Sequence, residues 1–187
     1  MSLILGLNAY HGDASACLVR DGVLLAAVEE ERFRRIKHWA GFPTESIRYC
    51  LGQAGVRLSD IDHVAINSDP KAQLFERFFF VVRKRPDVRL ILDRLRNHGK
   101  RLPAAAQLAL AFPGDDFRGE IHRVEHHLAH LASAFLVSPF AEAVAVSVDG
   151  FGDFASTAWG LGRGSTLAID GRVLFPQSLG AFYQAMT

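Results

Sequence analysis

The stretch Ser147-Val148-Asp149-Gly150-Phe151-Gly152-Asp153 decides the fold, because the pattern that it carries occurs twice in the chain. The apolar run Val144 to Val148 predicts a buried strand, and the acidic end with its two glycines predicts a turn. The same order opens the chain, where Leu3 to Asn8 leads into Ala9-Tyr10-His11-Gly12-Asp13-Ala14-Ser15. The small residues at both turns would let backbone amides approach a phosphate closely.

Each turn is followed by two more predicted strands and a helix. The first set is Ala14 to Val19, the hairpin turn Asp21-Gly22, Val23 to Val28 and a helix over Thr44 to Ala54. The second set is Ser156 to Leu161, Thr166 to Phe175 with a hairpin turn at Asp170-Gly171, and a helix that starts at Ser178.

A duplicated unit of three strands and a helix, with a phosphate turn after each first strand, is the plan of the actin-like ATPase (ribonuclease H-like) α/β fold. We expect a first subdomain at residues 1–138 and the truncated beginning of a second at 139–187. A basic helical arm is expected at about 70–115, where Lys71 to Arg101 carries ten Lys or Arg against three acids. This arm is either a solvated helical face or a surface for nucleic acid or another partner.

The composition excludes several classes of protein. Lys plus Arg number 21 and Asp plus Glu 20, so the net charge of +1 gives no general affinity for polyanions. Cys17 and Cys50 are too few for a disulfide framework, which indicates a reducing compartment. There is no signal peptide pattern and no apolar run near the ~20 residues that span a bilayer, so we expect a cytoplasmic protein without membrane contact.

His126 and His130 are the strongest candidate metal ligands. On a helix they lie one turn apart on the same face, where both imidazoles can reach one ion. His127 would point about 100° away and is interpreted as a packing residue. Two ligands are too few for tight binding, so a carboxylate, water or phosphate must supply the others. The alternative is that these are ordinary surface or capping histidines.

Four residues of the second turn are candidates for cofactor binding: Asp149, Gly150, Gly152 and Asp153. The glycines would permit close backbone approach, and the aspartates could hold a phosphate-bound cation. A plain hairpin turn is the alternative.

In the first turn, His11 and Asp13 offer a general base or an orienting pair, or they merely cap local backbone. Lys37, in the cationic run Glu31 to His38, could clamp phosphate oxygens or belong to a solvated loop. His38, His63 and His122 show no partner pattern and are interpreted as structural.

Six ordered motifs resemble the N-terminal part of the O-carbamoyltransferases of the NodU/CmcH type. They are Gly6-Leu-Asn-Ala-Tyr-His11-Gly-Asp-Ala-Ser-Ala16, Glu30-Glu-Arg-Phe-Arg-Arg-Ile-Lys-His38, Gly41-Phe-Pro43, Glu125-His-His-Leu-Ala-His130, Ser147-Val-Asp-Gly-Phe-Gly-Asp153 and Phe175-Pro-Gln-Ser-Leu-Gly-Ala-Phe-Tyr183. The resemblance implies an actin-like part followed by a C-terminal YrdC-like domain. That domain would make carbamoyl-adenylate from carbamoyl phosphate and ATP, and the actin-like part would transfer the carbamoyl group to a hydroxyl.

The resemblance also implies roles for individual residues. Iron(II) or another divalent metal would be held by His126 and His130, with a downstream aspartate completing the site. His11 would activate the acceptor, a small molecule or glycan, and Lys37 would contact the carbamoyl or phosphate group. Family members are far longer, so a truncated chain without the YrdC-like domain is expected to be inactive alone.

Two alternatives remain. A tRNA threonylcarbamoyl transferase-like protein would use the basic arm to grip tRNA, although the motif around His11 fits the small-molecule branch better, so nucleic acid is not expected. A non-catalytic actin-like scaffold fragment would bind no metal at the histidine pair. An unfinished second sheet would expose an edge, which favours a homodimer.

Overall fold

The computed structural model describes residues 1–84 and 102–187 and divides into two compact units. The described part of the first unit is Met1–Asn67 with 102–123, and that of the second is 68–84 with Val124–Thr187. The compact units therefore separate after Arg123, because the helix that follows packs on the second sheet. The boundary expected after residue 138 was drawn from the duplicated sequence pattern, not from compactness, and it stays a prediction.

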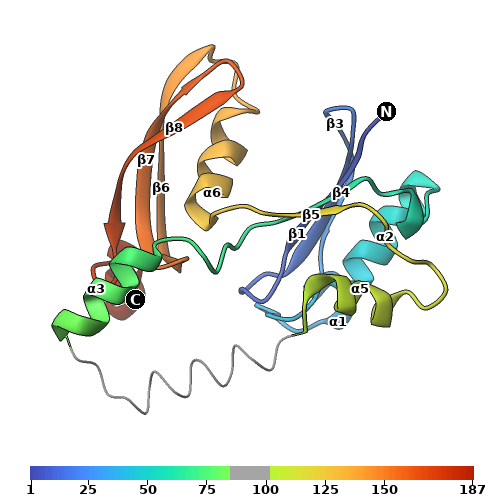
Figure 1. Cartoon of the computed structure of the whole chain (residues 1–187), viewed down its shortest axis with the longest axis horizontal. Helices are drawn as coiled ribbons and strands as arrows, with labels where there is room; N and C mark the ends of the chain where they lie inside the picture. The colour runs from blue at the N-terminus through green and yellow to red at the C-terminus, as the bar shows by residue number, and fades with distance from the viewer. Residues whose placement is uncertain (85–101) are drawn as a thin grey trace. The chain divides into compact units, whose positions relative to one another are not determined.

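The first unit is built on a five-stranded mixed sheet with the order β3-β2-β1-β4-β5 (Figure 1). The first three strands form an antiparallel meander. β4 pairs in parallel with β1, and β5 pairs in parallel with β4. The strands are β1 (Leu3–Asn8), β2 (Ser15–Arg20), β3 (Val23–Glu29), β4 (His63–Ile66) and β5 (Glu120–Arg123). Asp21 and Gly22 both have positive φ, at 48° and 83°, so the predicted tight hairpin turn is confirmed.

Helices cover the first sheet and close its core. They are α1 (Glu31–Arg34), α2 (Thr44–Ala54), the short η1 (Leu58–Asp60) and α5 (Ala104–Ala111). The apolar face of α2 packs on β2 and β3, and Gly55 ends the helix in the left-handed region at φ 63°. The fully buried side chains of this core include Leu5, Leu18, Ile47, Leu58, Val64 and Leu108.

The second unit repeats the antiparallel meander. Its strands are β6 (Glu142–Gly152), β7 (Ala155–Arg163) and β8 (Thr166–Leu174), and its helices are α3 (Leu74–Lys84), α6 (His126–Phe135) and α7 (Leu179–Met186). Leu131 and Phe135 of α6 pack on Ala145 and Ala158 of the sheet. Three strands followed by a helix thus occur in both units, and the predicted α/β fold of actin-like plan is confirmed.

Two turn predictions in the second unit are wrong. Asp170-Gly171 lies inside β8 at an irregularity of the ladder, where the ring of Trp159 covers Gly171, and the hairpin turn is at Gly164-Ser165. The acidic stretch is likewise not a turn throughout, because β6 continues to Gly152. The tight turn is Asp153-Phe154, with φ values of 46° and 74°.

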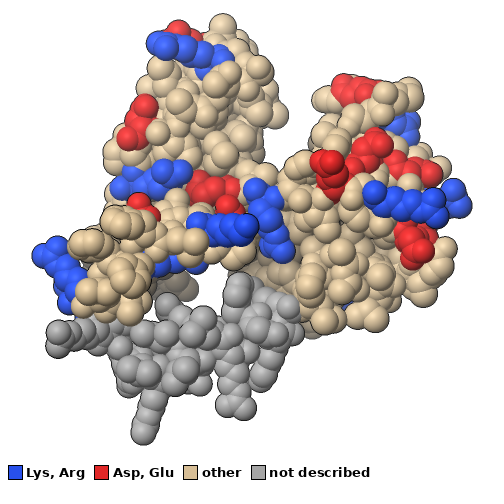
Figure 2. Space-filling model, in the orientation of Figure 1, with Lys and Arg blue, Asp and Glu red and all other residues tan. Residues whose placement is uncertain are grey.

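The basic arm is described only in part. The described part of the arm contains the helices α3 and α5, so its expected helical character is confirmed there, while residues 85–101 lie outside the described residues. On α3, Phe80 packs against Phe154 and Phe175, whereas Phe75 and Phe78 are exposed. On the visible face of each unit, acidic and basic side chains are interspersed (Figure 2). Within residues 1–84 and 102–187, no helix is both long and apolar enough to cross a bilayer.

Candidate functional site

Two carboxylates fix the first turn of α6. The Glu125 side chain, at the N-cap, accepts hydrogen bonds from the amides of His127 (3.1 Å) and Leu128 (2.9 Å). The Asp153 carboxylate accepts from the amide of His126 at 3.0 Å. Helix N-termini carry unsatisfied amides and favour negative charge, so both contacts stabilise this end of the helix. They set the position from which the histidines project.

His126, His130 and Asp149 converge in the second unit. The Nε2 atom of His126 lies 2.8 Å from Oδ2 of Asp149 and 3.0 Å from Nε2 of His130. The distance from His130 Nε2 to the same Asp149 oxygen is 3.6 Å. His126 is buried, while the His130 side chain is 48% exposed, so the cluster is open on the His130 side. The prediction that the two imidazoles lie close together on one face of a helix is confirmed, while metal binding stays a prediction.

Electrostatics favours the protonation states that a metal needs. Burial raises the pKa of Asp149, but hydrogen bonds from His126 and the Gly150 amide, with the nearby imidazoles, outweigh it and leave the pKa below its usual range. Burial and the neighbouring His126 lower the pKa of His130 although Asp149 opposes them. A deprotonated carboxylate and a neutral imidazole are ligand forms, since protonated groups cannot coordinate.

The other predicted cofactor residues have structural contacts. Neither Gly150 nor Gly152 has positive φ, and the backbone of Gly152 lies directly against the His126 ring. A Cβ at Gly150 would meet no atom within 4 Å, but the Gly150 amide donates to Asp149 and its carbonyl accepts from the hydroxyl of Ser178. The Asp153 carboxylate also accepts from the amide of Asp69 (2.8 Å) and the hydroxyl of Ser68 (3.2 Å). Cofactor binding by these residues stays a prediction.

His127 is fully buried and faces away from solvent, as expected of a packing residue. Its Nδ1 atom lies 2.9 Å from the hydroxyl of Ser147 on β6. Its Nε2 atom has no hydrogen-bond partner among the described residues. His127 therefore ties α6 to the sheet at the strand that carries Asp149.

In the first unit, Asp13 and His38 form a pair that the sequence did not predict. The Asp13 carboxylate and His38 Nδ1 are 2.9 Å apart, and both side chains are largely exposed. His11 is half-buried in the same loop as Asp13, and Lys37 is exposed next to His38. The catalytic roles of His11, Asp13 and Lys37 stay predictions.

Glu30 is a buried carboxylate that sequence reasoning missed. It accepts from the amide and hydroxyl of Ser46 (both 2.8 Å), from Nε of Arg34 (2.9 Å) and from the amide of Glu45 (3.3 Å). Burial raises its pKa, but these hydrogen bonds together outweigh burial and lower the pKa. Glu30 thus caps α2 from a distant position, and no local sequence pattern announces such a contact.

Comparison with known proteins places the chain in a family. Residues 3–187 match the family described as Carbamoyltransferase N-terminus. The chain is 40% identical to the uncharacterized protein sll1178 of Synechocystis, in an alignment that covers 100% of this chain and 32% of that protein. It is 38% identical to the nodulation protein NolNO of Sinorhizobium fredii over 94% of the chain and 25% of that protein.

The chain thus spans a quarter to a third of the length of these relatives. Among solved structures, YeaZ from Pseudomonas aeruginosa gives a TM-score of 0.49 at 17% identity, covering 94% of this chain and 68% of that one. The family match covers nearly all residues, including all six motifs quoted above. The chain belongs to the carbamoyltransferase N-terminus family.

Proposed function

We propose that this chain is the N-terminal part of a carbamoyltransferase that moves a carbamoyl group from carbamoyl-adenylate to a hydroxyl of a small-molecule or glycan acceptor. The single observation that carries the proposal is the convergence of His126, His130 and Asp149 in a chain of this family. Carbamoyl phosphate and ATP would be the source of the adenylate, made by an adenylate-forming domain of the kind that the resemblance implies.

The donor set fits a divalent transition metal. The set consists of two imidazole nitrogens and one carboxylate oxygen, all within 4.8 Å of one another. Such a set with open positions is typical of iron(II), and zinc also accepts it. Asp149 would thus be a third ligand, in addition to the two histidines that the resemblance implies.

A divalent metal bound at this cluster would supply Lewis-acid stabilisation of a carbonyl or phosphate oxygen. The chain's own residues would have three further tasks. Asp149 and His126 hold each other in place at 2.8 Å. The Cβ side of Gly150, where no atom lies within 4 Å, would leave room for the phosphate side of the donor and its cation. In the first unit, His11 would accept the proton of the acceptor hydroxyl and Lys37 would contact the donor oxygens, while Asp13 would hold His38.

The test measures, by calorimetry under anaerobic conditions, the binding of a non-hydrolysable carbamoyl-adenylate analogue to chain loaded with iron(II). It uses a His122→Ala background, which removes the other group of possible metal ligands, His63, Glu120 and His122. We expect about one iron per chain and analogue binding that is lost together with iron in His130→Ala. Ser133→Ala, three residues further along α6, is the matched control and should keep both. Two outcomes would contradict the proposal: the analogue binds equally tightly without iron, or iron stays bound in His130→Ala.

The isolated chain is expected not to consume carbamoyl phosphate in the presence of ATP. Incubation with labelled carbamoyl phosphate checks this point. Turnover by the chain alone would show that no further domain is needed to make the carbamoyl donor.

A further inference from the structure

We propose a second divalent-metal site in the first unit, formed by His63 on β4 with Glu120 and His122 on β5. Each residue offers one ligand atom, and these atoms lie within 4.8 Å of one another. The site shares no residue with the cluster on α6, and the proposal does not depend on the proposed function.

Strand register explains why these three side chains share a face. In the parallel ladder His63 pairs with Glu120, and Ala65 pairs with His122. Side chains two residues apart on a strand point to the same side, so Glu120 and His122 both project where His63 does. The alternate residues Val64 and Ile121 face the core instead. No local pattern indicates the cluster, because His63 lies 57 and 59 positions before Glu120 and His122 in the chain.

The distances suit a chelated ion. Nε2 of His122 lies 3.0 Å from Nδ1 of His63 and 3.7 Å from the Glu120 carboxylate. A tetrahedral metal with bonds of about 2.0–2.1 Å holds two of its ligand atoms about 3.3–3.4 Å apart. The two observed distances lie on either side of that value, so small side-chain rotations would complete the geometry.

The alternative is a simple hydrogen bond between the two imidazoles. Both side chains of the His122–Glu120 pair are exposed, at 47% and 76%, so water competes for the same atoms and such a contact adds little stability. That alternative also leaves the Glu120 carboxylate without a role, since 3.7 Å is too long for a hydrogen bond. A metal uses all three groups.

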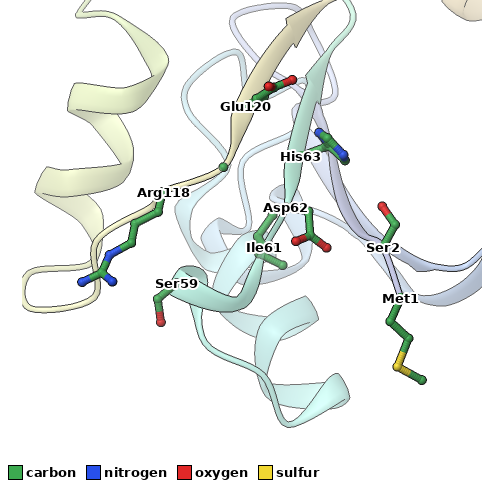
Figure 3. Close-up of a pocket in the computed structure, with 9 residues that line it drawn as sticks. Met1, Ser2, Ser59, Ile61, Asp62, His63, Arg118 and Glu120 are labelled. Carbon is green, nitrogen blue, oxygen red and sulfur yellow. The ribbon is translucent and has the colours of Figure 1, made fainter.

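A pocket of about 480 Å³ adjoins the cluster, and His63 and Glu120 line it together with Ser2, Asp62 and Arg118 (Figure 3). Figure 3 shows His63 and Glu120 projecting from neighbouring strands. The Asp62 carboxylate is already engaged, because it accepts from the amide of Leu3 at 2.8 Å. The pocket has room for water or an anionic ligand in the remaining coordination positions.

The ligand chemistry selects the kind of metal. Two imidazoles and one carboxylate suit borderline ions such as Zn²⁺, whereas Mg²⁺ and Ca²⁺ prefer oxygen ligands. Among residues 1–84 and 102–187, β5 pairs only with β4 and forms the edge of the sheet, so an ion bound to both strands would fasten that edge. The site is therefore assigned to Zn²⁺ as a clamp between β4 and β5.

The test measures Zn²⁺ binding to the 187-residue chain by equilibrium dialysis at neutral pH, in a His126→Ala/His130→Ala background that removes the other cluster. We expect one Zn²⁺ per chain and a rise in melting temperature with Zn²⁺ concentration. Adding His122→Ala should weaken binding at least tenfold and abolish the rise. His38→Ala, another exposed histidine of the same unit, is the matched control and should change neither.

The proposal is overturned if the background variant binds no Zn²⁺, or if His122→Ala and His63→Ala leave binding unchanged. If the background variant fails to fold, as judged by circular dichroism, the same count is made in the unaltered chain. There His122→Ala should lower the number of tight sites by one, and an unchanged number overturns the proposal.

Discussion

The imidazole ring of His126 lies directly on the backbone of Gly152, and a Cβ atom at residue 152 would clash with that ring. Glycine at this position therefore makes room for the ring of His126, a candidate metal ligand, and is not required by a positive φ angle. We expect Gly152→Ala to displace the His126 ring from Asp149 and to weaken metal binding at least tenfold. Equilibrium dialysis against iron(II) or Zn²⁺, in a His122→Ala background that silences the second proposed site, measures the effect.

Gly150→Ala is the matched control, because a Cβ at residue 150 meets no atom within 4 Å. The amide of residue 150, which donates to Asp149 at 2.6 Å, is kept in this variant. Equal loss of metal in the two alanine variants would mean that the ring contact is unimportant.

Asp149→Asn separates the charge of the carboxylate from its shape. The amide is similar in size but uncharged, so the contact with His126 at 2.8 Å loses its charged acceptor and the metal loses its anionic ligand. We expect metal affinity to fall at least tenfold while the melting temperature of the metal-free chain changes by only a few degrees. A variant that binds metal as tightly as the unaltered chain would exclude Asp149 as a ligand.

Cys50 is expected to be chemically inert in the folded chain. Burial, with Cys17 nearby, raises the pKa of its thiol to about 11, and the side chain is fully buried. The thiolate is the reactive form, so almost none is present at pH 8. Iodoacetamide followed by mass spectrometry should leave Cys50 unmodified until the chain is denatured in guanidinium. Rapid labelling of the folded chain would contradict the buried position.

Elements that depend on local pattern were predictable from the sequence. The hairpin at Asp21-Gly22 and the end of α2 at Gly55 follow from residues that tolerate positive φ, and both are present. The same reasoning failed at Asp170-Gly171, because glycine there makes room for Trp159, a partner on another strand. A glycine that admits a neighbouring ring and one that permits a turn look alike in sequence.

The candidate site was predictable as far as one helix determines it. The spacing of His126 and His130 placed both rings on one face of α6, and their ring centroids are 4.6 Å apart. The third partner, Asp149, was predicted only as a cofactor-binding residue. Its direct contact with the His126 ring depends on how α6 packs on β6, which no local pattern encodes. The contacts of Asp153 with Ser68 and Asp69 are long-range in the same sense.

Glu30 gives a prediction of stability. Its carboxylate is fully buried and accepts hydrogen bonds from Ser46, Arg34 and Glu45. Glu30→Gln removes the charge and points an amide at groups that are themselves donors, which should cost about 3 kcal/mol of unfolding free energy. Urea unfolding at pH 7 measures the loss. Glu29→Gln, at a neighbouring side chain that is 46% exposed, should change the value by no more than about 0.5 kcal/mol.

The same carboxylate makes this difference depend on pH. The pKa of Glu30 is lower in the folded chain than in the unfolded one, where it is about 4.3. The stabilisation is therefore fully present above the unfolded value and is lost as the pH falls through the folded pKa. The stability difference between the unaltered chain and Glu30→Gln should stay constant from pH 8 to about pH 5 and shrink below about pH 4. A difference that is the same at pH 3.5 and pH 7 would mean that the ionised carboxylate does not hold the start of α2.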